Sequence, residues 1–217
     1  MNDRIVNLPG GVRVAIQPPL HQQKQWLKGR YYEAPMLAHI RKHYRGGTFI
    51  DGGACIGNHT LFFAAFCAEQ VLAVEPVERN MAHLLTNVRL SGLQDKVTPV
   101  RAALGAAQGR GAMLHAGQMH GEYNLVEGDV VDVTTLDALM ELCRDPVTVV
   151  KLDIQWTEIA ALRGGLELLE RDHPALFIEL MMPEELSEAD NILERFGYVR
   201  TLRFGGSPTY EYVRKNG

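Results

Sequence analysis

Short apolar runs alternate with segments of helical periodicity along most of this chain. After residue 47, apolar runs predict five strands, at 48–52, 71–75, 97–103, 147–153 and 175–180. Between them, apolar residues recur every three or four positions, which predicts helices at 60–69, 79–90, 135–143 and 157–171. A parallel sheet with crossover helices requires this alternation, so we predict an α/β fold.

The end of the chain predicts a different connection. A helix at 184–196 is followed by two strands, 198–203 and 209–213, joined by Gly205-Gly206-Ser207-Pro208. Strands joined by so short a loop must be antiparallel. We therefore expect a mostly parallel seven-stranded sheet that finishes in a C-terminal antiparallel hairpin.

Three other segments have weaker patterns. Residues 6–16 predict a hairpin around Pro9-Gly10-Gly11, and residues 32–43 predict a helix that could act as a lid. Residues 105–133, rich in Gly and His, predict an irregular excursion. We divide the chain into a lead segment with a lid helix, 1–47, and a main domain, 48–217.

Charge is distributed unevenly. Residues 1–47 contain eight Lys or Arg against Asp3 and Glu33, whereas the remainder contains 14 basic and 24 acidic residues. A basic lead segment could attract an anionic substrate, or it could be an ordinary solvated helix face. The net charge of −4 argues against nucleic acid as a partner.

Composition indicates a soluble protein of the cytoplasm. No apolar run is long enough to cross a bilayer, and the polar start does not resemble a signal peptide. The three cysteines, Cys55, Cys67 and Cys143, lack metal-ligand spacing and suggest reduced thiols. No metal site is predicted, and a homodimer is one oligomeric state that the sequence leaves open.

The segment Phe49-Ile50-Asp51-Gly52-Gly53-Ala54-Cys55-Ile56-Gly57-Asn58 predicts a buried strand, a glycine-rich turn and the start of a helix. Glycine lets a backbone approach a ligand closely, and Glu75, at the tip of the next strand, is placed to bind a ribose diol. The pattern therefore favours a nucleoside-containing cofactor. A structural turn that binds no cofactor is the alternative.

The glycine spacing differs from the dinucleotide pattern Gly-x-Gly-x-x-Gly, because Ala54 and Cys55 occupy the positions that would need glycine. The stretch Asp-Gly-Gly-Ala-Cys-Ile-Gly instead resembles the first motif of S-adenosylmethionine (SAM)-dependent methyltransferases. The C-terminal hairpin is likewise typical of the class I, Rossmann-like methyltransferase topology and counts against a nicotinamide-dependent oxidoreductase.

Further stretches extend the resemblance to the FkbM-type family of methyltransferases. They are Tyr31-Tyr32-Glu33, Val74-Glu75-Pro76, Asn87-Val88-Arg89-Leu90, Arg101-Ala102-Ala103-Leu104-Gly105, Thr135-Leu136-Asp137 and Val150-Lys151-Leu152-Asp153-Ile154. The resemblance implies methyl transfer from SAM to a hydroxyl, often on a sugar or natural-product scaffold. N-methylation of a small amine or peptide, and a non-catalytic cofactor-binding protein, are the alternatives.

Two positions depart from the family pattern. Cys55 stands where Asn is usual, and Asp153-Ile154-Gln155-Trp156-Thr157-Glu158 replaces Asp-x-Glu-Gly-x-Glu. Gln155 cannot act as a base, and Trp156 could fill space beside the acceptor or offer a surface for stacking.

The candidate site residues follow from these motifs. Those expected to bind the cofactor are Tyr32, Glu33, Asp51, Gly53, Ala54, Gly57, His59, Glu75, Pro76, Arg101, Ala102 and Asp153. Those expected to serve catalysis are Asp153, Glu158 and Glu179. Those expected near the acceptor are Gln155, Trp156, His120 and Tyr123.

Overall fold

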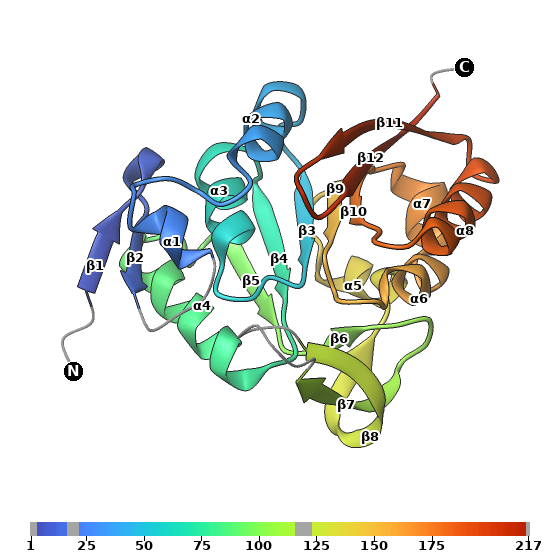
Figure 1. Ribbon diagram of the computed structural model, residues 1–217, viewed down its shortest axis with the longest axis horizontal. Helices are drawn as coiled ribbons and strands as arrows, with labels where there is room; N and C mark the ends of the chain where they lie inside the picture. Colours follow the sequence, from blue (N-terminus) through green and yellow to red (C-terminus); the bar gives the residue numbers. More distant parts are fainter. Residues whose placement is uncertain (1–3, 17–21, 116–122, 216–217) are drawn as a thin grey trace.

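The computed structural model describes residues 4–16, 22–115 and 123–215. Its centre is a seven-stranded sheet in the order β11-β12-β10-β9-β3-β4-β5 (Figure 1). The strands, in chain order, are β3 (Thr48–Gly52), β4 (Gln70–Val74), β5 (Val97–Val100), β9 (Val147–Leu152), β10 (Ala175–Glu179), β11 (Tyr198–Phe204) and β12 (Thr209–Arg214).

The pairing confirms the predicted topology. β10, β9, β3, β4 and β5 are parallel, whereas β12 runs antiparallel to both β10 and β11. The mostly parallel seven-stranded sheet with a C-terminal antiparallel hairpin is therefore present.

Alternate residues of each central strand point to opposite faces of the sheet, as strand geometry requires. Phe49, Val71 and Phe177 belong to one buried cluster, whereas their neighbours Ile50, Leu72 and Ile178 belong to the other. Residues that point to either face of these strands are apolar, because helices cover both faces of the sheet.

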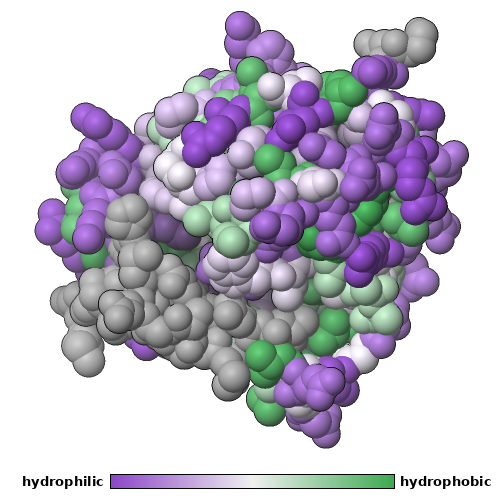
Figure 2. Space-filling model, turned by 45° about the vertical axis from the view of Figure 1, so that its right-hand side comes forward, coloured by the Kyte–Doolittle hydropathy of each residue, from purple (hydrophilic) through white to green (hydrophobic). Residues whose placement is uncertain are grey.

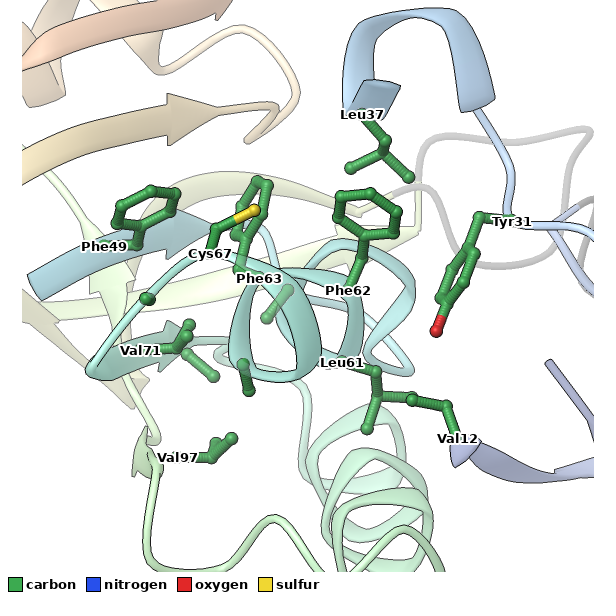
Figure 3. Close-up of a cluster of buried hydrophobic side chains, with 14 of the residues drawn as sticks. Val12, Tyr31, Leu37, Phe49, Leu61, Phe62, Phe63, Cys67, Val71 and Val97 are labelled. Atoms are coloured by element: carbon green, nitrogen blue, oxygen red, sulfur yellow. The ribbon is translucent and has the colours of Figure 1, made fainter. Parts of the chain in front are cut away.

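The first face is covered by α2 (Ala34–His43), α3 (Asn58–Phe66) and α4 (Glu78–Leu90). Figure 3 shows Leu61, Phe62 and Phe63 of α3 between the sheet and the N-terminal segment. The rings of Tyr31 and Phe62 meet edge to face with centroids 5.0 Å apart. α2 is held over the sheet by Glu211 of β12, which accepts hydrogen bonds from His39 and Tyr44.

The N-terminal hairpin joins the same layer. β1 (Arg4–Asn7) and β2 (Arg13–Ile16) flank a 3-10 turn, η1 (Pro9–Gly11), and α1 (Gln23–Trp26) follows. Ala15 of β2 donates its N–H to Asn87 Oδ1 of α4 at 2.8 Å. Val12, Val14 and Trp26 are buried in the cluster that contains Phe49, so the described lead segment shares the core of the sheet.

The second face is covered by α5 (Leu136–Leu139) with η2 (Met140–Leu142), α6 (Glu158–Arg163), α7 (Leu166–Asp172) and α8 (Pro183–Glu194). The single helix predicted over 157–171 is wrong, since Gly164 and Gly165 separate α6 from α7. A Cβ on Gly164 would lie 2.3 Å from the Gly105 carbonyl oxygen, so glycine there permits a close approach of two backbones.

The irregular excursion predicted for 105–133 is also wrong. β6 (Ala103–Leu104), β7 (Gly109–His115) and β8 (Tyr123–Thr134) form a separate three-stranded sheet, at the bottom of Figure 1. The pairing of β7 with β8 shifts register between Gly111 and Ala112, which breaks the alternation by which a strand is predicted. The predicted strand 97–103 accordingly ends at Val100, and Ala103 joins the small sheet.

Figure 2 shows a mainly hydrophilic surface on which hydrophobic residues form separate patches. Among the residues that the structure describes, none of the helices combines the length and the apolar character needed to cross a membrane.

A substitution at Gly53 tests the close approach of the glycine-rich turn to the residue that follows β9. The φ of Gly53 is +77°, and a Cβ would lie 1.8 Å from the Asp153 carbonyl oxygen. We predict that Gly53→Ala lowers the free energy of unfolding by about 2–5 kcal/mol, from left-handed backbone strain and overpacking. Gly92→Ala is the control, because φ is +66° there and a Cβ would meet no described atom within 4 Å. Denaturant unfolding should show a clearly smaller loss for Gly92→Ala, and equal losses would contradict the close approach.

Candidate functional site

Acidic residues gather where the central parallel strands end. Asp51 lies within β3, Glu75 follows β4, Asp153 follows β9 and Glu179 ends β10. The strands are in register there, with Gly52 opposite both Val74 and Leu152. Ligands of open α/β sheets bind outside this carboxyl edge, so these acids define the candidate site.

The glycine-rich turn lies against two neighbouring strand ends. The N–H groups of Gly53 and Ala54 both donate to the Val74 carbonyl at 3.0 Å. Gly53 also lies directly against the Asp153 carbonyl, where a side chain could not fit. Gly57, with φ +99°, ends the turn and precedes the first residue of α3. The turn is therefore held at both sides before any ligand binds.

Glu75 braces this turn from β4. Its Oε2 accepts from Cys55 N at 2.9 Å, and its Oε1 accepts from Val77 N at 2.8 Å and Asn80 Nδ2 at 3.3 Å. Burial raises the pKa of Glu75 to about 7. A carboxylate has about four acceptor positions. Glu75 can thus still accept a hydrogen bond from a ligand hydroxyl.

A buried lysine ties two strand ends together. Lys151 is 1% exposed, and its Nζ lies 3.2 Å from Asp153 Oδ2 and 3.8 Å from Asp51 Oδ1. Burial alone lowers the pKa of Lys151, but the charges of Asp153 and Asp51 outweigh it and raise that pKa. Asp51 Oδ2 also accepts from Thr60 Oγ1 of α3 at 2.5 Å. Lys151 is therefore a permanent cation beneath the site.

Asp153 and Glu179 share a hydrogen bond between their side chains. Two carboxylates can bond directly only if one holds a proton. Burial, together with the charge of Asp153, raises the pKa of Glu179 to about 9. Burial opposes ionisation of Asp153 too, but Lys151 outweighs it and lowers the pKa of Asp153. At neutral pH, Asp153 is thus ionised and Glu179 holds the proton.

The segment before α2 lies near these acids and Lys151. Glu33 Oε2 lies 2.8 Å from His59 Nε2, and these side chains are 11% and 4% exposed. The backbone of Tyr32 is held by Asn58, whose Oδ1 accepts from Tyr32 N at 2.9 Å. Burial raises the pKa of the Tyr32 phenol to about 12, and the negative charge of Glu33 contributes to the increase. This segment therefore adds one acid and one phenol to the site.

Two buried carboxylate oxygens of the site lack a hydrogen-bond partner among the described residues. They are Asp51 Oδ1 and Glu33 Oε2, and His59 Nε2 is likewise unsatisfied. Lys151 lies too far from Asp51 for a hydrogen bond, and the pair Glu33–His59 is close without being aligned as one. Buried acceptors without donors are costly. Acceptors of this kind suit a ligand that carries a positively charged donor.

Backbone strain is concentrated at the site. Among the described non-glycine residues, those with positive φ are Glu33, Cys55, Gln155, Trp156 and His173. All except His173, which follows α7, lie in the segments that surround the acids. Each such conformation costs about 1–3 kcal/mol and is typical of functional sites.

Several predicted residues therefore converge, but others have different surroundings. Glu158 is 4% exposed, and its Oε1 accepts from Ile154 N at 2.8 Å, which closes the loop after β9. Burial raises the pKa of Glu158 to about 7. Arg101 is exposed and lies 3.6 Å from Glu78 Oε2, while Ala102 is buried. Pro76 follows Glu75 and is partly exposed.

The remaining acceptor candidates are only partly described. Gln155 donates from Nε2 to Asp153 Oδ1 at 3.3 Å, and Trp156 is 52% exposed. His120 and the side chain of Tyr123 lie outside the described residues. Among the residues that are described, no group of three or more His, Cys, Asp or Glu side chains is arranged to hold a metal ion.

Sequence reasoning missed the residues that support the site: Lys151, Asn58, Thr60 and Asn80. Lys151 was detectable, because a lysine within an apolar strand is rarely buried unless it is paired. The three polar residues on α3 and α4 had no comparable signal.

Comparison with known proteins agrees with this arrangement. A family model described as "Methyltransferase FkbM domain" matches residues 51–200. No match was found among curated proteins. The crystal structure of a methyltransferase FkbM from Methylobacillus flagellatus is similar with a TM-score of 0.60 and 19% identity, over 77% of this chain and 43% of that one. The chain thus spans less than half the length of that protein.

Two other solved structures share the fold over most of their length. An rRNA methylase from Streptococcus thermophilus has a TM-score of 0.53 and 12% identity, over 84% of this chain and 96% of that one. A protein of Streptococcus mutans described as a methyltransferase, solved in complex with SAH, has a TM-score of 0.51 and 12% identity, over 82% and 93% of the two chains.

The family match covers more than half of the sequence and includes the glycine-rich turn, Glu75 and Asp153. The seven-stranded sheet and its C-terminal hairpin agree with the methyltransferase fold of the solved structures. The chain belongs to the FkbM family of methyltransferases.

Proposed function

We propose that this protein transfers a methyl group from SAM to a hydroxyl of a small molecule. The observation that carries the proposal is the position of the Asp153 carboxylate, which lies 3.2 Å from Lys151 Nζ and beside Glu179 at the carboxyl edge of the sheet. The unsatisfied oxygens of Asp51 and Glu33 beside it suit a cationic cofactor.

Each part of the cofactor has a candidate partner. Asp51 and Glu33 would bind the ammonium group, and His59 and Tyr32 would lie near the same amino acid end. The backbone from Gly53 through Ala54 to Gly57 would pass beneath the cofactor, and Glu75 would bind the ribose diol. Pro76, Arg101 and Ala102, which follow β4 and β5, would border the adenine.

When bound, SAM would supply an electrophilic methyl group to the acceptor oxygen and would leave as S-adenosylhomocysteine. Asp153 receives the proton of the hydroxyl. A base positioned in this way typically accelerates the reaction about 10²–10⁴-fold. Protonated Glu179 donates a hydrogen bond to Asp153 and holds it in place. Glu158 closes the loop behind these residues, so it has no chemical step in this proposal.

The alternatives are disfavoured by particular features. The structural similarity to an rRNA methylase suggests an RNA acceptor. The phosphates of RNA would be repelled by a protein with a net charge of −4 and a site rich in carboxylates. A non-catalytic protein would not need an ionised acid beside the cofactor. An amine acceptor would need no base, so the presence of Asp153 favours a hydroxyl acceptor over an amine.

Glu75 tests the cofactor site. We predict that Glu75→Ala weakens binding of S-adenosylhomocysteine about 10-fold or more, because hydrogen bonds to a charged group contribute about 1.5–3 kcal/mol. Calorimetric titration measures the affinity, after thermal unfolding has shown that the variant is folded. Glu78→Ala is the matched control, since the Glu78 side chain is 85% exposed. Unchanged affinity in Glu75→Ala would remove Glu75 from the ribose.

Substitutions of Asp153 and Glu179 test the roles proposed for them in methyl transfer. We predict that Asp153→Asn lowers transfer of labelled methyl to hydroxyl acceptors about 10²-fold or more, while SAH binding stays measurable. Glu179→Gln should retain activity, because glutamine can still donate to Asp153. Full activity of Asp153→Asn would exclude it as the base.

The proton on Glu179 also predicts a pH dependence. Since the pKa of Glu179 is raised to about 9, activity should persist through neutral pH and fall as the pH rises through 9. There, ionised Glu179 would repel ionised Asp153. A rate–pH profile should show this decline in the wild-type protein and not in Glu179→Gln. A decline of the same size in both proteins would contradict the shared proton.

A further inference from the structure

We propose that the acceptor is a neutral or cationic phenol whose ring stacks on Trp156. This inference rests on the proposed function and names the class of substrate that the site would take.

Trp156 lies at the apex of a tightly held loop. The loop follows β9, and its two ends are joined by the bond from Thr157 Oγ1 to the Ile154 carbonyl at 3.0 Å. Glu158 closes the same loop through Ile154 N, and Gln155 bonds Asp153. The position of Trp156 three residues after the proposed base is thus set by local contacts.

The backbone conformation of Trp156 is unfavourable for a residue that has a side chain. Its φ is +76°, and Gln155 before it has φ +56°. Glycine adopts this conformation readily, whereas a side chain is strained there. Strain of this kind points to a functional role rather than to stability.

The second tryptophan shows what a structural one looks like in this chain. Trp26 is fully buried, and its Nε1 donates to Asn58 Oδ1 at 3.0 Å. Trp156, in contrast, is 52% exposed. Its ring therefore contributes little to the core and offers a flat apolar surface to solvent.

Further exposed apolar side chains follow the neighbouring strand. Met181 and Met182 follow β10 and are each 47% exposed. β9 and β10 are parallel, with Leu152 opposite Ile178, and the bond between Asp153 and Glu179 continues that register. The loops with Trp156 and with the two methionines thus leave adjacent strand ends. Thioether sulfur contacts aromatic rings favourably.

The charge of these segments selects among aromatic ligands. Residues 152–162 and 179–189 contain no Lys or Arg, and their acids besides protonated Glu179 are Asp153, Glu158, Glu184, Glu185 and Glu188. Arg163 pairs with Glu188 and leaves the other acids without an arginine partner in these segments. Lys151 below them is buried and already paired. A phosphate-bearing acceptor would be repelled here, which favours a neutral or cationic ring over a nucleotide and over the anionic substrate suggested by the basic lead segment.

The weak basicity of Asp153 favours a phenol over a sugar hydroxyl. A phenol has a pKa of about 10. Water, whose acidity an aliphatic alcohol approaches, has a pKa of about 15.7. A carboxylate whose pKa is lowered by Lys151 can take a proton far more readily from the phenol.

The test combines binding and transfer with named probes. Catechol and tyramine are the neutral and cationic phenols, methyl glucoside is the aliphatic alcohol, and guanosine supplies a planar base. Binding is measured in the wild-type protein and in every variant by calorimetric titration with SAH present. In the wild-type protein, protection of tryptophan fluorescence from acrylamide is a second readout, because acrylamide reaches Trp156 and not Trp26. Transfer is measured with methyl-labelled SAM.

We expect a phenol to protect Trp156 and to accept methyl in preference to methyl glucoside and guanosine. Trp156→Gly should weaken phenol binding about 10-fold, the scale of one stacking contact, whereas Trp156→Phe retains most of it. Trp156→Gly should bind SAH normally and unfold at the same or a higher temperature, because glycine relieves the positive φ. Val130→Ala is the control, since Val130 is 75% exposed on β8.

Methylation of methyl glucoside or guanosine in preference to both phenols would overturn the aromatic acceptor and leave the proposed function intact. Unchanged phenol binding in Trp156→Gly would also overturn it. Failure of the wild-type protein to bind SAH would instead remove the proposed function.

Discussion

The candidate site depends on one buried cation. Lys151 joins the ends of β3 and β9 through Asp51 and Asp153, and both buried carboxylates would lose their lysine counter-charge without it. Breaking a buried ion pair by removing one partner typically costs about 3–5 kcal/mol. The same charge keeps Asp153 ionised beside Glu179, which holds the proton. One side chain thus stabilises the sheet and sets the protonation states at its edge.

The segments around this cation are held before a ligand arrives. Glu75 accepts the N–H of Cys55, Glu158 accepts that of Ile154, and Asn58 holds the backbone of Tyr32. These bonds maintain strained positions at Glu33, Cys55, Gln155 and Trp156. A site that is ordered in advance loses less entropy when it binds, which is how positioning contributes to catalysis.

The sequence predicted the parts of the fold that periodic patterns specify. Strand β3 has the expected bounds, and the C-terminal hairpin follows from its short turn. It did not predict the sheet of β6, β7 and β8, because a register shift interrupts the alternation, or the break between α6 and α7, which depends on distant Gly105. Motifs at strand ends located Asp51, Glu75 and Asp153. The proton shared with Glu179 depends on contact between adjacent strands, which spacing along the chain cannot show.

Titration of the wild-type protein with S-adenosylhomocysteine is the decisive test of whether the carboxyl edge of this sheet binds SAM. NAD serves as the control ligand, because the glycine turn differs from the dinucleotide pattern. We expect micromolar binding of S-adenosylhomocysteine and no heat from NAD. Binding of NAD alone, or of neither ligand, would contradict it.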